Sequence, residues 1–461
     1  MNKQECAIKY VEDNYLQFNR LRHDIIADKL QVRCAHPIGD RLRAPHDTSV
    51  AGDPAEAKGE RQEQWREMTK HDINSIVCHA AQEYDANITS REVMTALQSD
   101  LIPDVHPLRE YILSLPPFTP DQPDWIDFVA SQVRVRTNNN EDTLIQQPKQ
   151  QITNNIPLAN TASGEGNNTT PSASRLWRAC FKKWFVAMVA SWMKDEVVNH
   201  QVLVLIGKQG IYKTTWLEHL IPPHLRAYAC KLANSSDLNK DERLRIAEFG
   251  LISLDEIDSM NSRELNQLKS IITATDVNER AAYAYTKERR VRLASFCASG
   301  NRRDFLTDIT GNRRWLPFEV ESIQSPFTTI LPYERMYAQA WALAQDPFFS
   351  YWFDLDEIEV LEQHNQHFRD ESNEEQLLDV YFAIPPTDAT NAKFLTTAEI
   401  SERLIYYGNI KKPMSLSRLG VLLSQKGFLS IRKGTPHRRG WIIYERENEE
   451  INAERRMLSK N

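Results

Sequence analysis

The sequence predicts an α/β core built around a parallel sheet, with a helical N-terminal domain and a C-terminal winged-helix-like domain. Three observations predict this fold class. Short apolar runs at 202–206, 251–254 and 294–298 are typical of buried parallel strands. Apolar residues recur at helical spacing from 174 to 197, just before the first of these runs. In the tail, two helical patterns precede two strand patterns, an order that suggests a winged helix-turn-helix.

The composition indicates an ordinary globular protein of several domains. Of 461 residues, 41% are hydrophobic and 26% are charged. No apolar run approaches the roughly 20 residues that span a bilayer, and no signal-peptide core follows the N-terminus. We therefore expect a cytoplasmic protein without a membrane partner. The six cysteines are scattered without a C-x-x-C pair, so no structural metal is expected.

Composition and pattern divide the chain into five segments. A mostly helical domain spans 1–136 and contains a mobile loop at 35–59. A linker rich in Asn, Thr and Ser follows at 137–174, and we expect disorder there because it can bury little apolar surface. The remaining segments are the core at 175–322, a helical extension with an acidic stretch at 323–390, and a basic winged-helix-like domain at 391–461.

Charge is distributed unevenly along the chain, although the net charge is only −7. From 354 to 379 the chain has ten acidic residues and one basic residue, Arg369. From 393 to 444 it has ten basic residues and two acidic ones. The negative net charge argues weakly against nucleic-acid binding over the whole surface. The basic stretch at 393–444 is nevertheless a local candidate for nucleic-acid binding.

A phosphate-binding loop is predicted at GKQGIYKTT, residues 207–215, between the first strand and a helical pattern. Backbone N–H groups of such a loop cradle phosphates, Lys213 would reach the β- and γ-phosphates, and Thr214 would bind Mg²⁺. This predicts an ATP site in a P-loop NTPase core. Its expected nucleotide contacts are Gly207, Gly210, Lys213, Thr214, Thr215 and Asp255.

Polar residues at the ends of the later strands complete the predicted site. Asp255 suits Mg²⁺ coordination and Glu256 suits activation of water, unless this pair is only a solvated acidic turn. Asn301 ends the third strand, near the expected ligand crevice. Arg313 and Arg314 could stabilise charge on a γ-phosphate, in cis or from a neighbouring subunit; the alternative is a surface turn with solvated arginines.

At these residues the chain resembles the virulence-associated protein E (VapE) family of P-loop ATPases, which is related to superfamily 3 helicases and is encoded largely on mobile genetic elements. The resemblance rests on GKQGIYKTT, LISLDEIDSM and ASGNRRDFLTDITGNRRWLPFEV, in the family's order and spacing. It extends back to HPLREYILSLPPFTPDQPDWIDFVA and forward to YERMYAQAWALA. The family implies an AAA+/superfamily 3-like sheet and assembly into a ring, with a hexamer as the expected size.

The resemblance also implies roles for individual residues. Lys213 matches the Walker A lysine, Asp255 and Glu256 the Walker B pair, Asn301 a sensor, and Arg313 with Arg314 finger-type arginines. Tyr212 departs from the family's commoner glycine, which permits any backbone angle. A tyrosine fits if its φ stays negative and its ring points away from the ligand. Because the other site residues are all kept, we expect the loop to bind nucleotide.

Two regions are candidates for DNA binding. Related ring helicases place a DNA-gripping hairpin between the Walker B and sensor motifs, where basic residues of 280–292 alternate with Tyr283 and Tyr285. The alternative there is a charged surface hairpin, and a winged helix can also dock proteins. The candidates are Lys287, Arg289 and Arg290 in the first region, and Arg418, Lys426, Arg432, Lys433, Arg438 and Arg439 in the tail.

These observations predict an ATP-dependent DNA helicase or translocase that uses ATP and Mg²⁺ during replication of a mobile element. Its partners would be single-stranded or forked DNA, other copies of the chain, and a separate primase or initiator, since 1–137 shows no paired-carboxylate polymerase pattern. The alternative is a nucleotide-gated DNA-binding regulator that unwinds nothing.

Overall fold

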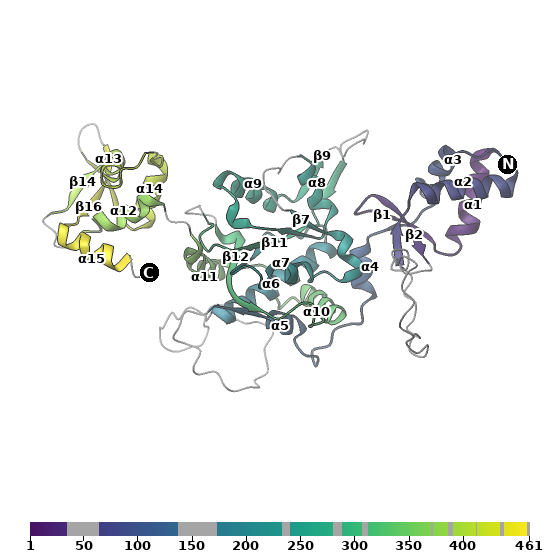
Figure 1. The fold of residues 1–461 in the computed structure, drawn as a ribbon, viewed down its shortest axis with the longest axis horizontal. Helices are drawn as coiled ribbons and strands as arrows, with labels where there is room; N and C mark the ends of the chain where they lie inside the picture. The colour runs from purple at the N-terminus through teal and green to yellow at the C-terminus, as the bar shows by residue number, and fades with distance from the viewer. Residues whose placement is uncertain are drawn as a thin grey trace, which may run out of the picture.

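The computed structural model describes ten stretches of the chain, which form three units along the long axis of Figure 1. The expected mobile loop (35–59) and nearly all of the expected linker (137–172) lie outside the described residues. The described residues are 1–34, 64–136, 173–232, 240–279, 288–306, 312–369, 372–385, 391–411, 413–433 and 438–458.

The N-terminal unit contains a four-stranded sheet as well as helices, whereas the sequence predicts mostly helix. The strand order is β3-β2-β1-β4. The helices begin at polar caps, and Asn2, Thr69 and Thr89 each form a capping box with the residue three positions on. The elements are α1 (Lys3–Val11), η1 (Glu12–Leu16), β1 (Leu21–Asp24), β2 (Lys29–Cys34), β3 (Gln64–Glu67), α2 (Lys70–Tyr84), α3 (Ser90–Leu97) and β4 (Asp104–Val105).

The central unit is built on a six-stranded sheet in the order β5-β12-β6-β11-β8-β7. The strands from β12 to β7 run parallel, and β5 pairs antiparallel with β12. The three strands predicted from apolar runs are therefore confirmed as adjacent, parallel and buried. The strands are β5 (Val133–Val135), β6 (Val202–Ile206), β7 (Ala229–Leu232), β8 (Leu251–Leu254), β11 (Ser295–Gly300) and β12 (Trp315–Ile323).

Helices cover both faces of this sheet. Side chains alternate along β6, so Leu203 and Leu205 pack in the cluster of α6, whereas Val202, Val204 and Ile206 pack with α8 and α9. The predicted helix before the first strand is α6, which is almost wholly buried. The helices are α4 (Pro107–Ser114), α5 (Trp125–Ala130), α6 (Ala173–Met193), α7 (Lys213–Glu218), η3 (Pro223–Tyr228), α8 (Lys240–Glu248), η5 (Ile257–Ser259), α9 (Ser262–Thr273), η6 (Asn312–Arg314), α10 (Tyr333–Gln345), α11 (Leu355–Asn365) and η7 (Gln366–Phe368).

Two antiparallel strands, β9 (Asp276–Glu279) and β10 (Glu288–Val291), pair beside the central sheet. They lie between the second and third predicted strands, where the sequence suggests a hairpin. The segment that connects them, 280–287, lies outside the described residues.

The C-terminal unit begins with a helix of the acidic stretch. Leu378 and Phe382 pack in the same buried cluster as Leu419 and Trp441, so the unit starts near 372 rather than at 391. Its elements are α12 (Asn373–Tyr381), β13 (Phe382–Ala383), β14 (Lys393–Leu395), α13 (Thr397–Gly408), α14 (Leu416–Gln425), β15 (Leu429–Lys433), β16 (Arg438–Glu445) and α15 (Asn448–Leu458). β16 pairs antiparallel with β13, β14 and β15.

The N-terminal and central units meet through buried polar contacts. Asp24 of β1 is fully buried and accepts a hydrogen bond of 2.6 Å from the Tyr228 hydroxyl. Residues 107–135, which the sequence assigns to the N-terminal domain, pack with α6 instead; Leu108, Ile126 and Val133 belong to its cluster. Within the parts of the chain that the structure describes, no helix has the length and apolar character needed to cross a bilayer.

Candidate functional site

The candidate site lies at the carboxyl edge of the central sheet. The 207–212 loop leaves the end of β6 there and leads into α7. Asp255 follows β8, and Asn301 follows β11. Because these strands are parallel neighbours, their carboxyl ends meet at one edge, where ligands of open α/β sheets bind.

Lys213 is enclosed by the loop that precedes it. Its side-chain Nζ lies 2.7 Å from the carbonyl oxygens of both Gly207 and Lys208, and 3.3 Å from Asn301 Oδ1. Burial lowers the pKa of Lys213, and the nearby carboxylates of Asp258 and Asp255 offset part of that effect. The predicted Walker A lysine and sensor asparagine are thus in contact.

Thr214, Ser299 and Asp255 form a compact set of oxygen atoms beside the lysine. Asp255 Oδ1 accepts hydrogen bonds from Ser299 Oγ at 2.7 Å and from Thr214 Oγ1 at 3.2 Å, and the two hydroxyls are 2.9 Å apart. Burial raises the pKa of Asp255, but hydrogen bonds from Lys231, Ser299 and Thr214 outweigh it and hold the pKa below its ordinary value. One ionised carboxylate with hydroxyl oxygens suits Mg²⁺, which is bound through few protein ligands plus phosphates.

Lys231 is a site residue that sequence reasoning missed. It lies on β7, next to β8, and its Nζ is 2.9 Å from Asp255 Oδ2. This hydrogen bond raises the pKa of Lys231. A single lysine in a short strand pattern gives no signal in the sequence, because the contact depends on which strand becomes the neighbour of β8.

Asp258 is a second missed residue, and it positions the end of β11. Its carboxylate accepts hydrogen bonds from the backbone N–H groups of Asn301, at 3.0 Å, and Arg302, at 3.1 Å. A Cβ at Gly300 would lie 2.8 Å from Asp258 Oδ1, so a side chain there would break this approach. In the sequence, Asp258 could have been singled out as the second aspartate of the DEID motif, residues 255–258. Glu256 of the same motif is exposed and adopts a left-handed backbone with φ 53°.

Tyr212 does not adopt the negative φ that was the condition for a tyrosine to fit at this position. Its φ is 67°, a left-handed conformation that costs a non-glycine residue roughly 1–2 kcal/mol. The loop therefore keeps the backbone shape that glycine would give, and Gly210 also has a positive φ of 85°. The Tyr212 side chain is 41% exposed, and its ring contacts Phe327.

Arg313 and Arg314 lie at the opposite edge of the sheet from the loop. They immediately precede Trp315, which pairs with Val202 at the start of β6, whereas the loop follows the end of β6. Five residues of strand separate the two edges by about 16 Å. The structure therefore does not bring these arginines to Lys213 of the same chain.

The turn that carries the two arginines is held by a buried asparagine of α11. Asn365 is 1% exposed and donates hydrogen bonds to the carbonyl oxygens of Asn312, at 2.8 Å, and Trp315, at 3.0 Å. Burial lowers the pKa of Arg314, and the charge of Arg313 lowers it further. The turn is thus fixed to the sheet edge from both ends.

Two other arginines follow Asn301 directly and lie at the loop's own edge. Arg302 and Arg303 are both exposed, and Arg303 forms an ion pair with Glu319. Glu319 in turn pairs in register with Ile206, the last residue of β6. Neither arginine is among the site residues predicted from the sequence, although both stand inside the quoted ASGNRRDF motif.

The candidate DNA-binding residues near the β9–β10 pair differ in exposure and in their ion-pair partners. Lys287 lies outside the described residues. Arg289 is exposed and forms an ion pair of 2.7 Å with Asp276, and Arg290 forms ion pairs with Asp28 and Glu248. Arg292, also counted in the basic pattern, is 1% exposed and donates to backbone carbonyls, so it belongs to the core rather than to a DNA surface.

In the C-terminal unit the six basic residues predicted to contact DNA have three kinds of surroundings. Lys426 forms ion pairs with Asp379, at 2.6 Å, and Glu375, at 3.6 Å, so the acidic stretch compensates its charge. Arg418 is exposed in the first turn of α14. The other four cations are exposed and lie opposite one another across the β15–β16 pair: Arg432 with Arg439, and Lys433 with Arg438.

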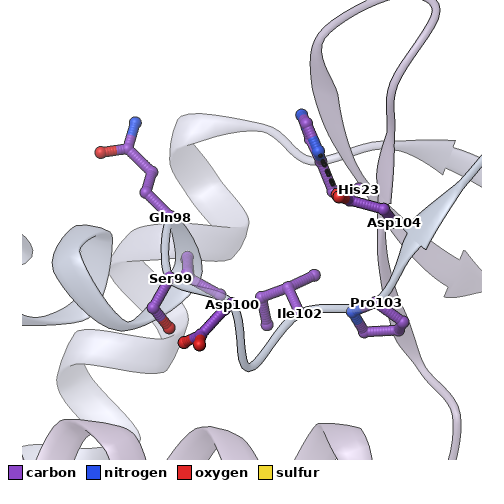
Figure 2. Close-up of a pocket in the computed structure, with 8 residues that line it drawn as sticks. His23, Gln98, Ser99, Asp100, Ile102, Pro103 and Asp104 are labelled. Carbon is purple, nitrogen blue, oxygen red and sulfur yellow. Dashed lines mark hydrogen bonds and ion pairs between the residues drawn. The ribbon is translucent and has the colours of Figure 1, made fainter.

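Features elsewhere in the described residues do not add to the site. No three of their His, Cys, Asp and Glu side chains gather closely enough to hold a metal ion by themselves. A surface pocket lies in the N-terminal unit, between the end of α3 and β4 (Figure 2). His23 lines it, with Nδ1 2.8 Å from Asp104 Oδ1. None of the residues predicted from the sequence lines this pocket.

The fold and the site define an α/β protein with a parallel sheet and a lysine–hydroxyl–carboxylate cluster at its carboxyl edge. Residues 168–376 match the family model of the virulence-associated protein E-like domain. The resemblance inferred from the motifs is thereby confirmed.

Solved structures of the NrS-1 C-terminal region, all in apo form, align with nearly the whole chain. One has 9% sequence identity and a TM-score of 0.37, covering 96% of this chain and 100% of the other. A second has 10% identity and a TM-score of 0.38, covering 95% and 100%. No curated protein matches the chain.

Proposed function

We propose that the chain is an ATP-dependent DNA helicase or translocase that acts in replication of a mobile genetic element. The observation that carries this proposal is the contact set at the carboxyl edge of the sheet. There the loop lysine meets Asn301 at 3.3 Å, and Thr214 meets Asp255 at 3.2 Å. The match of residues 168–376 to the virulence-associated protein E-like domain supports it.

In the proposed reaction, the chain's own residues bind and orient ATP and water. The 207–215 loop would cradle the phosphates, and the Lys213 ammonium would pair with the β- and γ-phosphates. Glu256, exposed at this edge, would accept a proton from the attacking water, and Asn301 would orient the γ-phosphate. Thr214 and Asp255 would hold Mg²⁺, which neutralises developing charge when bound.

We propose that Arg313 or Arg314 of one subunit completes the site of its neighbour. The register of β12 with β6 supports this arrangement, because it separates the arginines of a chain from that chain's own loop. An arginine delivered in trans is a known way to stabilise the γ-phosphate in the transition state. Assembly into a closed ring, with the hexamer that the family implies, would give every loop such a neighbour.

The proposed DNA contacts are the exposed cations of the β15–β16 hairpin, with α13 and α14 as a winged-helix domain. Like charges directly opposite each other destabilise a strand pair, so Arg432 opposite Arg439 is better suited to an anionic partner than to stability. Arg289 and Lys287 are proposed as further contacts to single-stranded or forked DNA. Primer synthesis would be left to a separate primase or initiator.

The same hairpin favours a second candidate function, a nucleotide-gated regulator that binds a DNA site without unwinding. The two functions differ in turnover. We would measure ATP hydrolysis by the purified protein with and without single-stranded DNA, beside Lys213→Ala and Glu256→Gln. The motor requires hydrolysis that rises with DNA and is lost in both variants. A folded, assembled protein without turnover that binds one DNA sequence tightly would instead be the regulator.

A further inference from the structure

Three aromatic rings form a ledge beside the 207–215 loop: Tyr212, His219 and Phe327. Phe327 is central, with its ring centroid 6.1 Å from that of Tyr212 and 5.8 Å from that of His219. Both contacts are edge-to-face. Tyr212 and Phe327 remain 41% and 71% exposed, so this aromatic ledge offers ring surface that the chain itself does not cover.

Neighbouring elements hold the aromatic ledge in place. His219 Nδ1 lies 2.7 Å from the Thr215 carbonyl oxygen, and the Tyr333 hydroxyl donates to the His219 carbonyl oxygen at 2.7 Å. Phe327 stands in the turn between β12 and α10, where the Thr328 N–H donates to the Ser325 carbonyl oxygen at 3.2 Å. The rings are therefore arranged before any ligand arrives.

The aromatic ledge lies on the opposite side of the loop from the carboxylate. Asp255 and Asn301 follow β8 and β11, on one side of β6, whereas Phe327 follows β12, on the other side. Thr214 turns toward Asp255, and Tyr212 turns toward Phe327. A triphosphate with its γ end at Asp255 and Asn301 would have its α end, and the nucleoside attached to it, on the side of Phe327.

We propose that the aromatic ledge stacks against the base of the bound nucleotide, a purine such as adenine. This inference rests on the proposed ATP site. Every base has a π-face, so an aromatic side chain beside the loop can stack on it. Stacking would account for a tyrosine at position 212. Its ring supplies aromatic surface, while its left-handed φ of 67° preserves the backbone shape of the loop.

The test compares a ligand that has a base with one that lacks it. We would titrate the full chain calorimetrically with ADP and with inorganic pyrophosphate, both with Mg²⁺. Phe327→Ala should weaken ADP binding roughly tenfold and leave pyrophosphate binding within twofold. Tyr212→Gly should act in the same direction, and Phe327→Trp should retain ADP affinity. Ile330→Ala is the matched control, because Ile330 is 88% exposed in the same turn region and outside the ring contacts.

Each result decides between the inference and the function on which it rests. If the wild-type protein binds both ligands, Lys213→Ala weakens both, and Phe327→Ala changes neither, then the stacking inference fails alone. If Phe327→Ala weakens pyrophosphate as much as ADP, or only reduces assembly in sedimentation, the ring serves the loop or an interface, and the inference also fails. A folded wild-type protein that binds neither ligand overturns both the inference and the proposed ATP site.

Discussion

Lys231 Nζ lies 2.9 Å from Asp255 Oδ2, while the other oxygen of the same carboxylate accepts hydrogen bonds from Thr214 and Ser299. The two oxygens of the proposed metal ligand therefore have different partners. A cation that approaches Asp255 meets one oxygen already paired with an ammonium group. Lys231 and Mg²⁺ would compete for the negative charge of this carboxylate.

Replacing Lys231 by Met should lower the Mg²⁺ requirement of the site. The Lys231 side chain is 45% exposed, so the pair is worth at most about 1 kcal/mol, and we expect a roughly threefold decrease in the Mg²⁺ concentration for half-maximal ADP binding. This Mg²⁺ concentration is measured by following ADP binding while Mg²⁺ is titrated. Lys231→Arg keeps the charge and should resemble the wild type. A higher Mg²⁺ requirement in Lys231→Met would show that Lys231 supports the metal instead.

Removing the Asp258 carboxylate should slow turnover more than it weakens ATP binding. Asp258 holds the backbone of Asn301 through a hydrogen bond of 3.0 Å, and loss of a bond to a charged group costs about 1.5–3 kcal/mol. We expect Asp258→Ala to reduce kcat at least tenfold with KM for ATP within twofold, and Asp258→Asn to lose less. Steady-state hydrolysis checks both values. Asp304→Ala, an exposed carboxylate in the same segment, is the control. An equal loss in Asp304→Ala would mean that charge rather than position matters.

Mixing two inactive variants should restore hydrolysis if the arginines act across a subunit boundary. Lys213→Ala lacks the loop lysine, and the double variant Arg313→Ala, Arg314→Ala lacks the arginines. In a random equal mixture about a quarter of the interfaces combine an intact loop with intact arginines. Hydrolysis by the mixture should therefore exceed the sum of the separate variants by an amount near a quarter of the wild-type rate. A mixture no more active than its components would place the catalytic arginine elsewhere, with Arg303 as the nearest alternative.

His106 should make the protein less stable as the pH falls from about 6.5 to 4. It caps α4 by accepting a hydrogen bond from the Arg109 N–H at 3.2 Å. Burial, with a further contribution from Arg109, lowers the pKa of His106 to about 4, so the unfolded chain binds the proton more readily over this interval. The stabilisation is complete above the ordinary histidine pKa and is lost toward pH 4, by roughly 2 kcal/mol.

The His106 contribution can be isolated with an asparagine cap, which accepts the same hydrogen bond but does not titrate. Chemical unfolding of wild type and His106→Asn at pH 7 and pH 4.5 gives the free energy of unfolding of each. The wild type should lose roughly 2 kcal/mol more than the variant over this interval. Parallel losses in the two proteins would mean that His106 is protonated equally in the folded and unfolded states.

The central sheet could be predicted because its strands are apolar along their whole length. β6 and β8 occupy the residues expected for them, since every residue of each is buried and a continuous apolar run is therefore required. The N-terminal sheet gave no such signal. Its strands β1 and β3 have the sequences LRHD and QWRE, which contain charged residues. Ion pairs between strands compensate such charges, as between Lys29 of β2 and Glu67 of β3.

The sequence could predict which candidate residues lie at the ends of strands, but not contacts that depend on which strands become neighbours. Lys213, Thr214, Asp255 and Asn301 each follow a strand that the sequence reveals. The contact of Lys231 with Asp255 depends on β7 becoming the neighbour of β8. Likewise, the sequence left open whether Arg313 and Arg314 serve their own chain, because only the register of Trp315 with Val202 separates them from the loop.

The length of β6 has a consequence for stoichiometry. In an assembly where the two ends of this strand serve different catalytic centres, each chain contributes half of one centre and half of the next. An open row of such chains always has one complete centre fewer than it has chains, and a lone chain has none. When the row closes into a ring, the number of complete centres equals the number of chains. The specific activity per chain should therefore rise with protein concentration and reach its maximum only when the rings are closed.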